Sequence, residues 1–154
     1  MMTAADSMTQ EETTLRITRD FKASPEKVYD AWTNPEMLVQ WWGPEGMTTP
    51  DCEMDVRAGG HWKTTMTSTK EGGAYTVSGI YKVLERPNRL CFSWGWINDG
   101  VRGHETDVDL TFEAIEGGTR MTMVQKVFAD PEQTKNHDQG WSSSFNDLQR
   151  FVEA

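Results

Sequence analysis

The chain has 154 residues, which is the length of one ordinary domain and too short for two substantial hydrophobic cores. No apolar run approaches the roughly 20 residues that a membrane-spanning helix requires, so we expect no insertion into a membrane. The formal net charge of −9 repels phosphate backbones and anionic lipid headgroups, and nucleic acid is therefore not an expected partner.

The start of the chain and its two cysteines indicate a cytoplasmic protein. Residues 1–12 are polar and acidic and lack the basic and apolar segments of a secretory signal. We expect them to form a disordered lead-in to one domain over residues 13–154. Cys52 and Cys91 stand in separate strand-like segments without metal-ligand spacing, so a reducing cytosol should keep both as free thiols.

The first predicted elements are one strand and two short helices. Apolar and polar residues alternate over Thr13–Phe21, as in a half-buried strand. Ser24-Pro25-Glu26 has the residues of a helix start, namely a capping hydroxyl, a proline and an acid. Asn34-Pro35-Glu36 repeats that pattern and predicts a second helix to about Trp42, where Gly43-Pro44 ends it.

The segment from Met47 to Phe128 is typical of six strands separated by turns. The predicted turns are Ala58-Gly59-Gly60, Glu71-Gly72-Gly73, Arg86-Pro87-Asn88, Asn98-Asp99-Gly100 and Glu116-Gly117-Gly118. The residues expected on one face are Trp62, Thr64 and Met66; Tyr75, Val77, Tyr81 and Val83; Leu90, Phe92, Trp94 and Trp96; Val108, Leu110 and Phe112; and Met121, Met123 and Val127. Adjacent hairpins are the simplest pairing.

The end of the chain predicts a long amphipathic helix. After Ala129-Asp130-Pro131 the apolar period changes to that of a helix, and His137 lies in a polar segment leading into it. The apolar stripe consists of Trp141, Phe145, Leu148 and Val152. Together these elements predict an α+β helix-grip fold, in which a curved seven-stranded antiparallel sheet surrounds the C-terminal helix and two short helices separate the first two strands.

Four segments of the chain carry a family resemblance. They are SPEKVYDAWTNPEMLVQWWGPEGMTTP, MDVRAGGHW, SGIYKVLERPNRLCFSW and GWSSSFNDLQRFV. From about Leu15 onward the chain resembles the bacterial homologues of the activator of heat-shock-protein ATPase, in the START-like superfamily that also holds birch-pollen-allergen-like domains. The resemblance implies a cavity for an apolar small molecule, although the superfamily includes lipid carriers, polyketide cyclases and chaperone regulators.

Seven tryptophans and nine methionines suggest a cavity lined by aromatic and adaptable side chains, although they could also simply fill a small core. Trp94 and Trp96 lie on the same face of one strand and need either deep burial or a large space. Strand alternation and the helix stripe give nine candidate ligand-binding residues: Met66, Tyr81, Trp94, Trp96, Phe112, Met123, Trp141, Phe145 and Leu148. Of the adjacent Trp41 and Trp42, one should face away from the core, toward a pocket rim or a possible homodimer contact.

Patterns for catalysis are sparse, and we assign no catalytic residue, metal or cofactor. His61, His104 and His137 show no metal-ligand spacing. His104-Glu105 is either an acid/base pair at a pocket mouth or a solvated pair. Ser142-Ser143-Ser144 lacks the GxSxG motif of a nucleophile.

Three functions fit these expectations. The first is a non-enzymatic protein that binds a hydrophobic small molecule, lipid-like or polyketide-like and aromatic. The second is a cyclase or aromatase type of enzyme that uses the same cavity and needs titratable side chains inside it. The third is a protein regulator that resembles a co-chaperone ATPase activator, but a chaperone partner is not expected.

Overall fold

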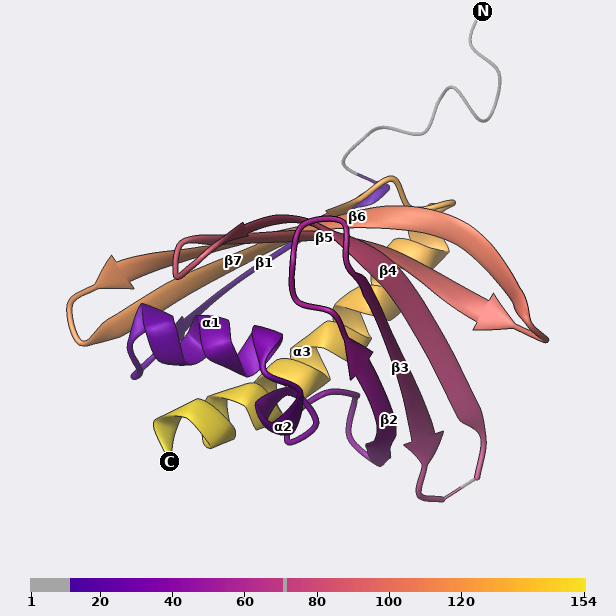
Figure 1. Cartoon of the computed structure of the whole chain (residues 1–154), viewed down its shortest axis with the longest axis horizontal. Helices are drawn as coiled ribbons and strands as arrows, with labels where there is room; N and C mark the ends of the chain where they lie inside the picture. The colour runs from indigo at the N-terminus through magenta and orange to yellow at the C-terminus, as the bar shows by residue number, and fades with distance from the viewer. Residues whose placement is uncertain (1–11, 71) are drawn as a thin grey trace, which may run out of the picture.

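The computed structural model describes residues 12–70 and 72–154. Most of the predicted lead-in, residues 1–11, and Glu71 of one predicted turn lie outside the described residues. The described part forms a strongly curved sheet that arches over a long helix, with two short helices beside it (Figure 1). Within it, no helix combines the length and the apolar character needed to cross a membrane.

The sheet contains seven antiparallel strands, as the sequence predicted. The strands are β1 (Thr14–Phe21), β2 (Met47–Met54), β3 (His61–Ser68), β4 (Ala74–Glu85), β5 (Arg89–Asn98), β6 (Val101–Ile115) and β7 (Gly118–Lys126). Their spatial order is β1-β7-β6-β5-β4-β3-β2, so neighbours from β2 to β7 form hairpins and β1 pairs with the last strand. The α+β helix-grip fold is thereby confirmed.

The first two helices, α1 (Pro25–Thr33) and α2 (Pro35–Leu38), start where the sequence predicted. The Ser24 hydroxyl accepts a hydrogen bond from the Lys27 backbone N–H at 3.2 Å. The Asn34 side chain accepts one from the Glu36 backbone N–H at 2.9 Å. Each cap satisfies a backbone donor that the first turn of a helix leaves without a partner.

The prediction that α2 extends to Trp42 and exposes one indole is wrong. α2 ends at Leu38, and the next residues form tighter turns in which the Trp41 N–H bonds to the Leu38 carbonyl at 3.2 Å. Adjacent side chains therefore no longer point in directions set by a regular helix. Trp41 is 1% exposed and Trp42 is 5% exposed, so neither offers a surface for a homodimer.

The long helix α3 (Pro131–Glu153) lies against the concave side of the sheet (Figure 1). Asp130 caps it, because its side chain accepts a hydrogen bond from the Gln133 N–H at 2.8 Å. The helix therefore starts well before the apolar stripe that predicted it. His137, which the sequence placed in a polar lead-in, lies within the helix.

Two strand predictions fail where the strands are irregular. The pairing of β4 with β5 shifts between Tyr81 and Val83, so Leu84, and not Val83, packs against the core. β7 ends at Lys126, and Val127 beyond it has a positive φ of 70° and is 53% exposed, although the alternation placed it inside.

Candidate functional site

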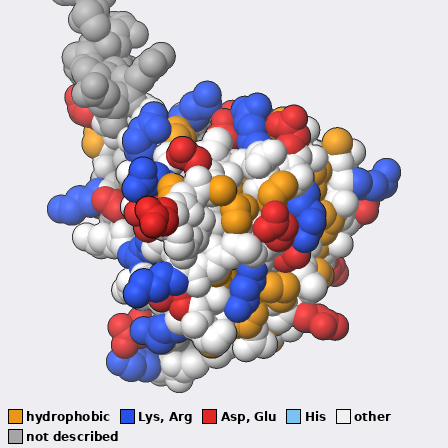
Figure 2. Space-filling view, turned by 90° about the vertical axis from the view of Figure 1, so that its left-hand side faces the viewer, with side chains coloured by type: hydrophobic (Ala, Val, Ile, Leu, Met, Phe, Trp, Pro, Cys, Tyr) orange, Lys and Arg blue, Asp and Glu red, His pale blue; other side chains and the backbone are white. Residues whose placement is uncertain are grey.

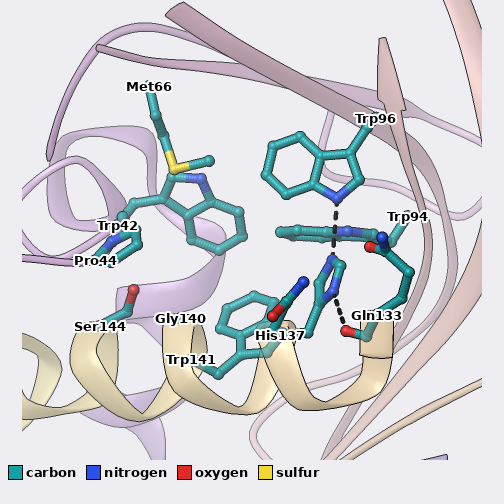
Figure 3. A pocket seen from close by; sticks show the side chains of 12 residues that line it. Trp42, Pro44, Met66, Trp94, Trp96, Gln133, His137, Gly140, Trp141 and Ser144 are labelled. Carbon is teal, nitrogen blue, oxygen red and sulfur yellow. Dashed lines mark hydrogen bonds between the residues drawn. The ribbon is translucent and has the colours of Figure 1, made fainter. Parts of the chain in front are cut away.

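A cavity of about 280 Å³ lies between the concave face of the sheet and the N-terminal half of α3 (Figure 3). The sheet contributes Met66 from β3 and Trp94 and Trp96 from β5. The segment Trp42-Gly43-Pro44, between α2 and β2, forms another wall. The residues contributed by α3 are Gln133, Asn136, His137, Gly140, Trp141 and Ser144.

The aromatic walls follow from alternation along β5. Phe92 and Trp94 point inward and are buried, and Trp96 continues that face where the strand leaves the packed core, so it is only half-buried. The rings of Trp94 and Trp96 meet edge to face, with centroids 5.4 Å apart. Trp94 and Trp141 lie 5.0 Å apart, which joins the sheet wall to the helix wall.

Two stripes of α3 face inward. The predicted apolar stripe packs in the core, where Phe145 and Leu148 are fully buried. A second stripe of polar or small residues faces the cavity: Gln133, Asn136, His137, Gly140 and Ser144. Apart from the adjacent pair Asn136 and His137, these residues follow one another at steps of three or four positions, which places them on one side of the helix. The wall formed by α3 therefore differs chemically from the aromatic wall opposite.

Gly140 leaves bare helix backbone at the cavity wall. A β-carbon at this position would have the Pro44 Cγ as its nearest neighbour, at 3.9 Å, which is an ordinary contact. Neighbouring atoms thus do not require a glycine here, and a glycine inside a helix is less favourable than alanine. Its effect in this structure is to keep the cavity wider.

His137 is a neutral part of the wall. Its Nδ1 lies 2.8 Å from the Gln133 carbonyl oxygen, which can only accept, so Nδ1 carries the proton. Its Nε2 then accepts a hydrogen bond from the Trp96 indole N–H at 3.0 Å (Figure 3). Burial lowers the pKa of His137 below its usual value, and the bond to Gln133 offsets part of this effect.

A buried polar chain holds Trp141 in place. The Trp141 indole N–H donates to Gln125 Oε1 at 2.8 Å, and the Gln125 side-chain amide donates to the Thr106 hydroxyl, also at 2.8 Å. Gln125 is fully buried on β7. Sequence reasoning missed it, although a glutamine at the inward position after Met121 and Met123 was a usable signal.

The nine candidate residues fall into three groups. Met66, Trp94, Trp96 and Trp141 line the cavity. Tyr81 lines a separate space of only about 10 Å³ beside Trp32. The remaining candidates are at most 3% exposed and lie in the hydrophobic core, outside the cavity lining: Phe112, Met123, Phe145 and Leu148. Trp42, Pro44 and the whole polar stripe of α3 line the cavity but were not among the candidates.

The lining carries no fixed charge, since none of the described residues around the cavity is Asp, Glu, Lys or Arg. Charges gather outside instead, and Figure 2 shows acidic and basic side chains interspersed on one outer face. Across residues 12–70 and 72–154, no group of three or more His, Cys, Asp or Glu side chains is placed to hold a metal ion.

The predicted pair His104-Glu105 does not line this cavity. His104 is exposed, and its Nε2 contacts the Val127 carbonyl oxygen. Glu105 instead forms an ion pair with Arg102 at 3.6 Å. The positions of His104 and Glu105 therefore fit a solvated pair and not an acid/base pair at the mouth of this cavity.

Comparisons with known proteins identify the family of this chain. Residues 22–153 match the family described as "Activator of Hsp90 ATPase homolog 1-like protein". The solved structure of a protein from Chromobacterium violaceum superimposes with a TM-score of 0.83 at 27% identity, covering 92% of this chain and 98% of that one. The AHSA1 protein from Silicibacter pomeroyi has a TM-score of 0.81 at 33% identity, covering 89% and 95%. A comparison with curated proteins found no match.

Proposed function

The chain belongs to the activator of Hsp90 ATPase homolog 1-like family, and we propose that it binds a small apolar molecule in the cavity between the sheet and α3. The observation that carries this proposal is an uncharged cavity with four tryptophans in its walls: Trp42, Trp94, Trp96 and Trp141. Large rigid rings with few polar groups among them are typical of sites that recognise apolar ligands.

The cavity volume limits the ligand. A cavity of about 150 Å³ in a protein core accommodates one benzene molecule, so the roughly 280 Å³ available here suits about two fused rings. Burial of about 300 Å² of apolar ligand surface contributes roughly 7.5 kcal/mol, from which several kcal/mol are lost on association. We therefore expect dissociation constants in the micromolar to millimolar range for a purely apolar ligand.

A titration with N-phenyl-1-naphthylamine, a neutral probe whose emission rises in apolar surroundings, tests this proposal. The wild type should bind one probe molecule, and Gly140→Leu should weaken binding at least tenfold because the new side chain fills the cavity. Gln139→Leu is the matched control, since Gln139 is the neighbouring exposed residue and does not line the cavity. Equal binding by the three proteins, or no emission change with the wild type, would contradict the proposal.

The other two interpretations receive less support. An enzyme of the cyclase or aromatase type needs a side chain that can move a proton, and His137, the titratable residue in the lining, has both nitrogens engaged in hydrogen bonds. A regulator of an ATPase would act through the outer surface. Its binding to such a partner should be unaffected by Gly140→Leu, which separates that interpretation from ligand binding.

We also propose a reducing cytoplasmic location. Cys52 and Cys91 are both free thiols. They lie on β2 and β5, which are three strand spacings apart, or about 14 Å. A disulfide requires Cα atoms within about 7 Å, so these two cysteines cannot pair in this fold.

A further inference from the structure

Ser144 is the one buried polar side chain among the described residues that line the cavity. It is 4% exposed and lies one helical turn after Gly140 on the cavity side of α3. Its hydroxyl has no hydrogen-bond partner among the described residues. Figure 3 shows the oxygen directed away from the helix, on the side of Trp42 and Pro44.

The Ser144 oxygen is not fully enclosed, unlike the unpartnered indole nitrogens of Trp32 and Trp94, so a molecule in the cavity can reach it. A serine in a helix commonly bonds to the carbonyl four residues earlier, and several polar side chains of α3 do bond within the helix. Thr134, for example, donates to the Asp130 carbonyl at 3.2 Å. Ser144 departs from this behaviour at the position where its hydroxyl meets the cavity, which leaves the hydroxyl available to a bound molecule.

The other polar groups of the lining do not offer the same contact. His137 already uses both ring nitrogens. The amides of Gln133 and Asn136 belong to exposed residues, where water can satisfy them. The Trp94 indole N–H also lacks a partner among the described residues, but the nitrogen is itself buried. Among the buried residues of the lining, Ser144 therefore offers the hydrogen-bonding group that a ligand can reach.

The absence of charge from the lining restricts the ligand further. Transfer of an ionised group from water to an apolar site is costly unless an opposite charge or several hydrogen bonds compensate it. The lining contains no Lys or Arg to pair with an anion and no Asp or Glu to pair with a cation. A charged group held among the tryptophans would thus lose its hydration without an opposite charge to compensate it.

We propose that the ligand is a neutral, flat aromatic molecule of about two fused rings that carries one hydroxyl or carbonyl group, and that this group forms a hydrogen bond with Ser144. The aromatic part lies between the tryptophan walls and the bare backbone at Gly140. This inference rests on the proposed function and specifies the class of molecule that the same cavity takes.

Three probes of similar size test the proposal: 2-naphthol, 2-methylnaphthalene and 2-naphthoate, titrated separately near pH 7 by ligand-observed NMR. Ser144→Ala should weaken binding of 2-naphthol about 2- to 12-fold, the range expected for the loss of one hydrogen bond. Binding of 2-methylnaphthalene should stay the same or improve. The ionised 2-naphthoate should bind wild type at least tenfold more weakly than 2-naphthol.

The matched control is Ser142→Ala. Ser142 lies on the same helix, donates to Asp138 at 3.2 Å and does not line the cavity, so its replacement should change none of the three affinities. Thermal unfolding of both variants checks that they are folded.

The outcomes separate the two proposals. The ligand class is wrong if Ser144→Ala affects 2-naphthol and 2-methylnaphthalene equally, if 2-naphthoate binds as well as 2-naphthol, or if N-phenyl-1-naphthylamine binds while all three smaller probes do not. If neither N-phenyl-1-naphthylamine nor any of the three binds the wild type, the proposed function fails as well.

Discussion

Replacement of Trp32 by alanine should remove much of the stability of this protein while leaving the cavity between the sheet and α3 in place. Trp32 of α1 is 2% exposed and does not line that cavity. Its ring lies 4.7 Å from that of Trp41, 5.7 Å from that of Trp141 and 5.9 Å from that of Phe145, measured between centroids. It therefore joins α1, the segment after α2 and α3 in one aromatic cluster.

The expected loss follows from the area of the side chain. A buried tryptophan removes about 150 to 250 Å² from water, which corresponds to roughly 4 to 6 kcal/mol at 25 cal/mol per Å². Substitutions of this kind cost about 3 to 5 kcal/mol in practice. The indole N–H of Trp32 has no partner among the described residues, so the loss reflects packing and leaves no broken hydrogen bond. A loss of this size would be a large share of the free energy of unfolding, which is about 5 to 15 kcal/mol for a typical domain.

Urea unfolding followed by far-ultraviolet circular dichroism measures this loss, and Trp96→Ala provides the comparison. Trp96 is half-buried and lines the cavity, so its replacement should cost less stability but weaken binding of N-phenyl-1-naphthylamine more. A loss below about 1 kcal/mol for Trp32→Ala would refute the assignment of this residue to the core. A larger stability loss for Trp96→Ala than for Trp32→Ala would refute the distinction between core and cavity wall.

Two further predictions concern titratable groups. Because burial lowers the folded-state pKa of His137, the unfolded chain binds more protons at mildly acidic pH, and this residue contributes stability that is lost as the pH falls below its usual pKa of about 6.5. The free energy of unfolding should thus fall less between about pH 7.5 and 5.5 in His137→Gln than in wild type. Burial also raises the pKa of Cys91 to about 11, and it raises the pKa of Cys52 as well. Both thiols should therefore react slowly with thiol reagents at about pH 8, and Cys52→Ala with Cys91→Ala should remain folded.

Each of these predictions has a contrary result. An equal or steeper loss of stability on acidification in His137→Gln would show that this side chain is not held neutral by the fold. A mass about two daltons lower without reductant, restored by reduction, would show that Cys52 and Cys91 are not free.

Much of the fold was predictable because its signals are local. Alternation of apolar residues and glycine-containing turns predicted the strands of the meander, and the caps at Ser24 and Asn34 predicted both short helices. The errors in the strand predictions arise at positions that depend on how one strand pairs with its neighbour. The shift between Tyr81 and Val83 is a property of the pairing of β4 with β5, and no single-strand pattern contains it.

The candidate site was predictable only on its aromatic side. The inward positions of β3 and β5 led to Met66, Trp94 and Trp96, which line the cavity. Phe112 and Met123 satisfy the same alternation rule but lie where the sheet packs tightly. Alternation identifies the inner face of a strand, whereas the presence of a cavity depends on how closely the helix approaches each part of that face.

The polar side of the cavity escaped prediction for a different reason. An amphipathic helix is recognised by its apolar stripe, and in α3 that stripe marks the part that packs in the core, with Trp141 as its one residue that also lines the cavity. Two residues of the lining depart from ordinary helix preference: the glycine at position 140 and Ser144, whose hydroxyl makes no hydrogen bond within the helix. Departures from local preference of this kind are expected at functional sites. In α3 both departures lie one turn apart on the same cavity wall, which supports a ligand as their common cause.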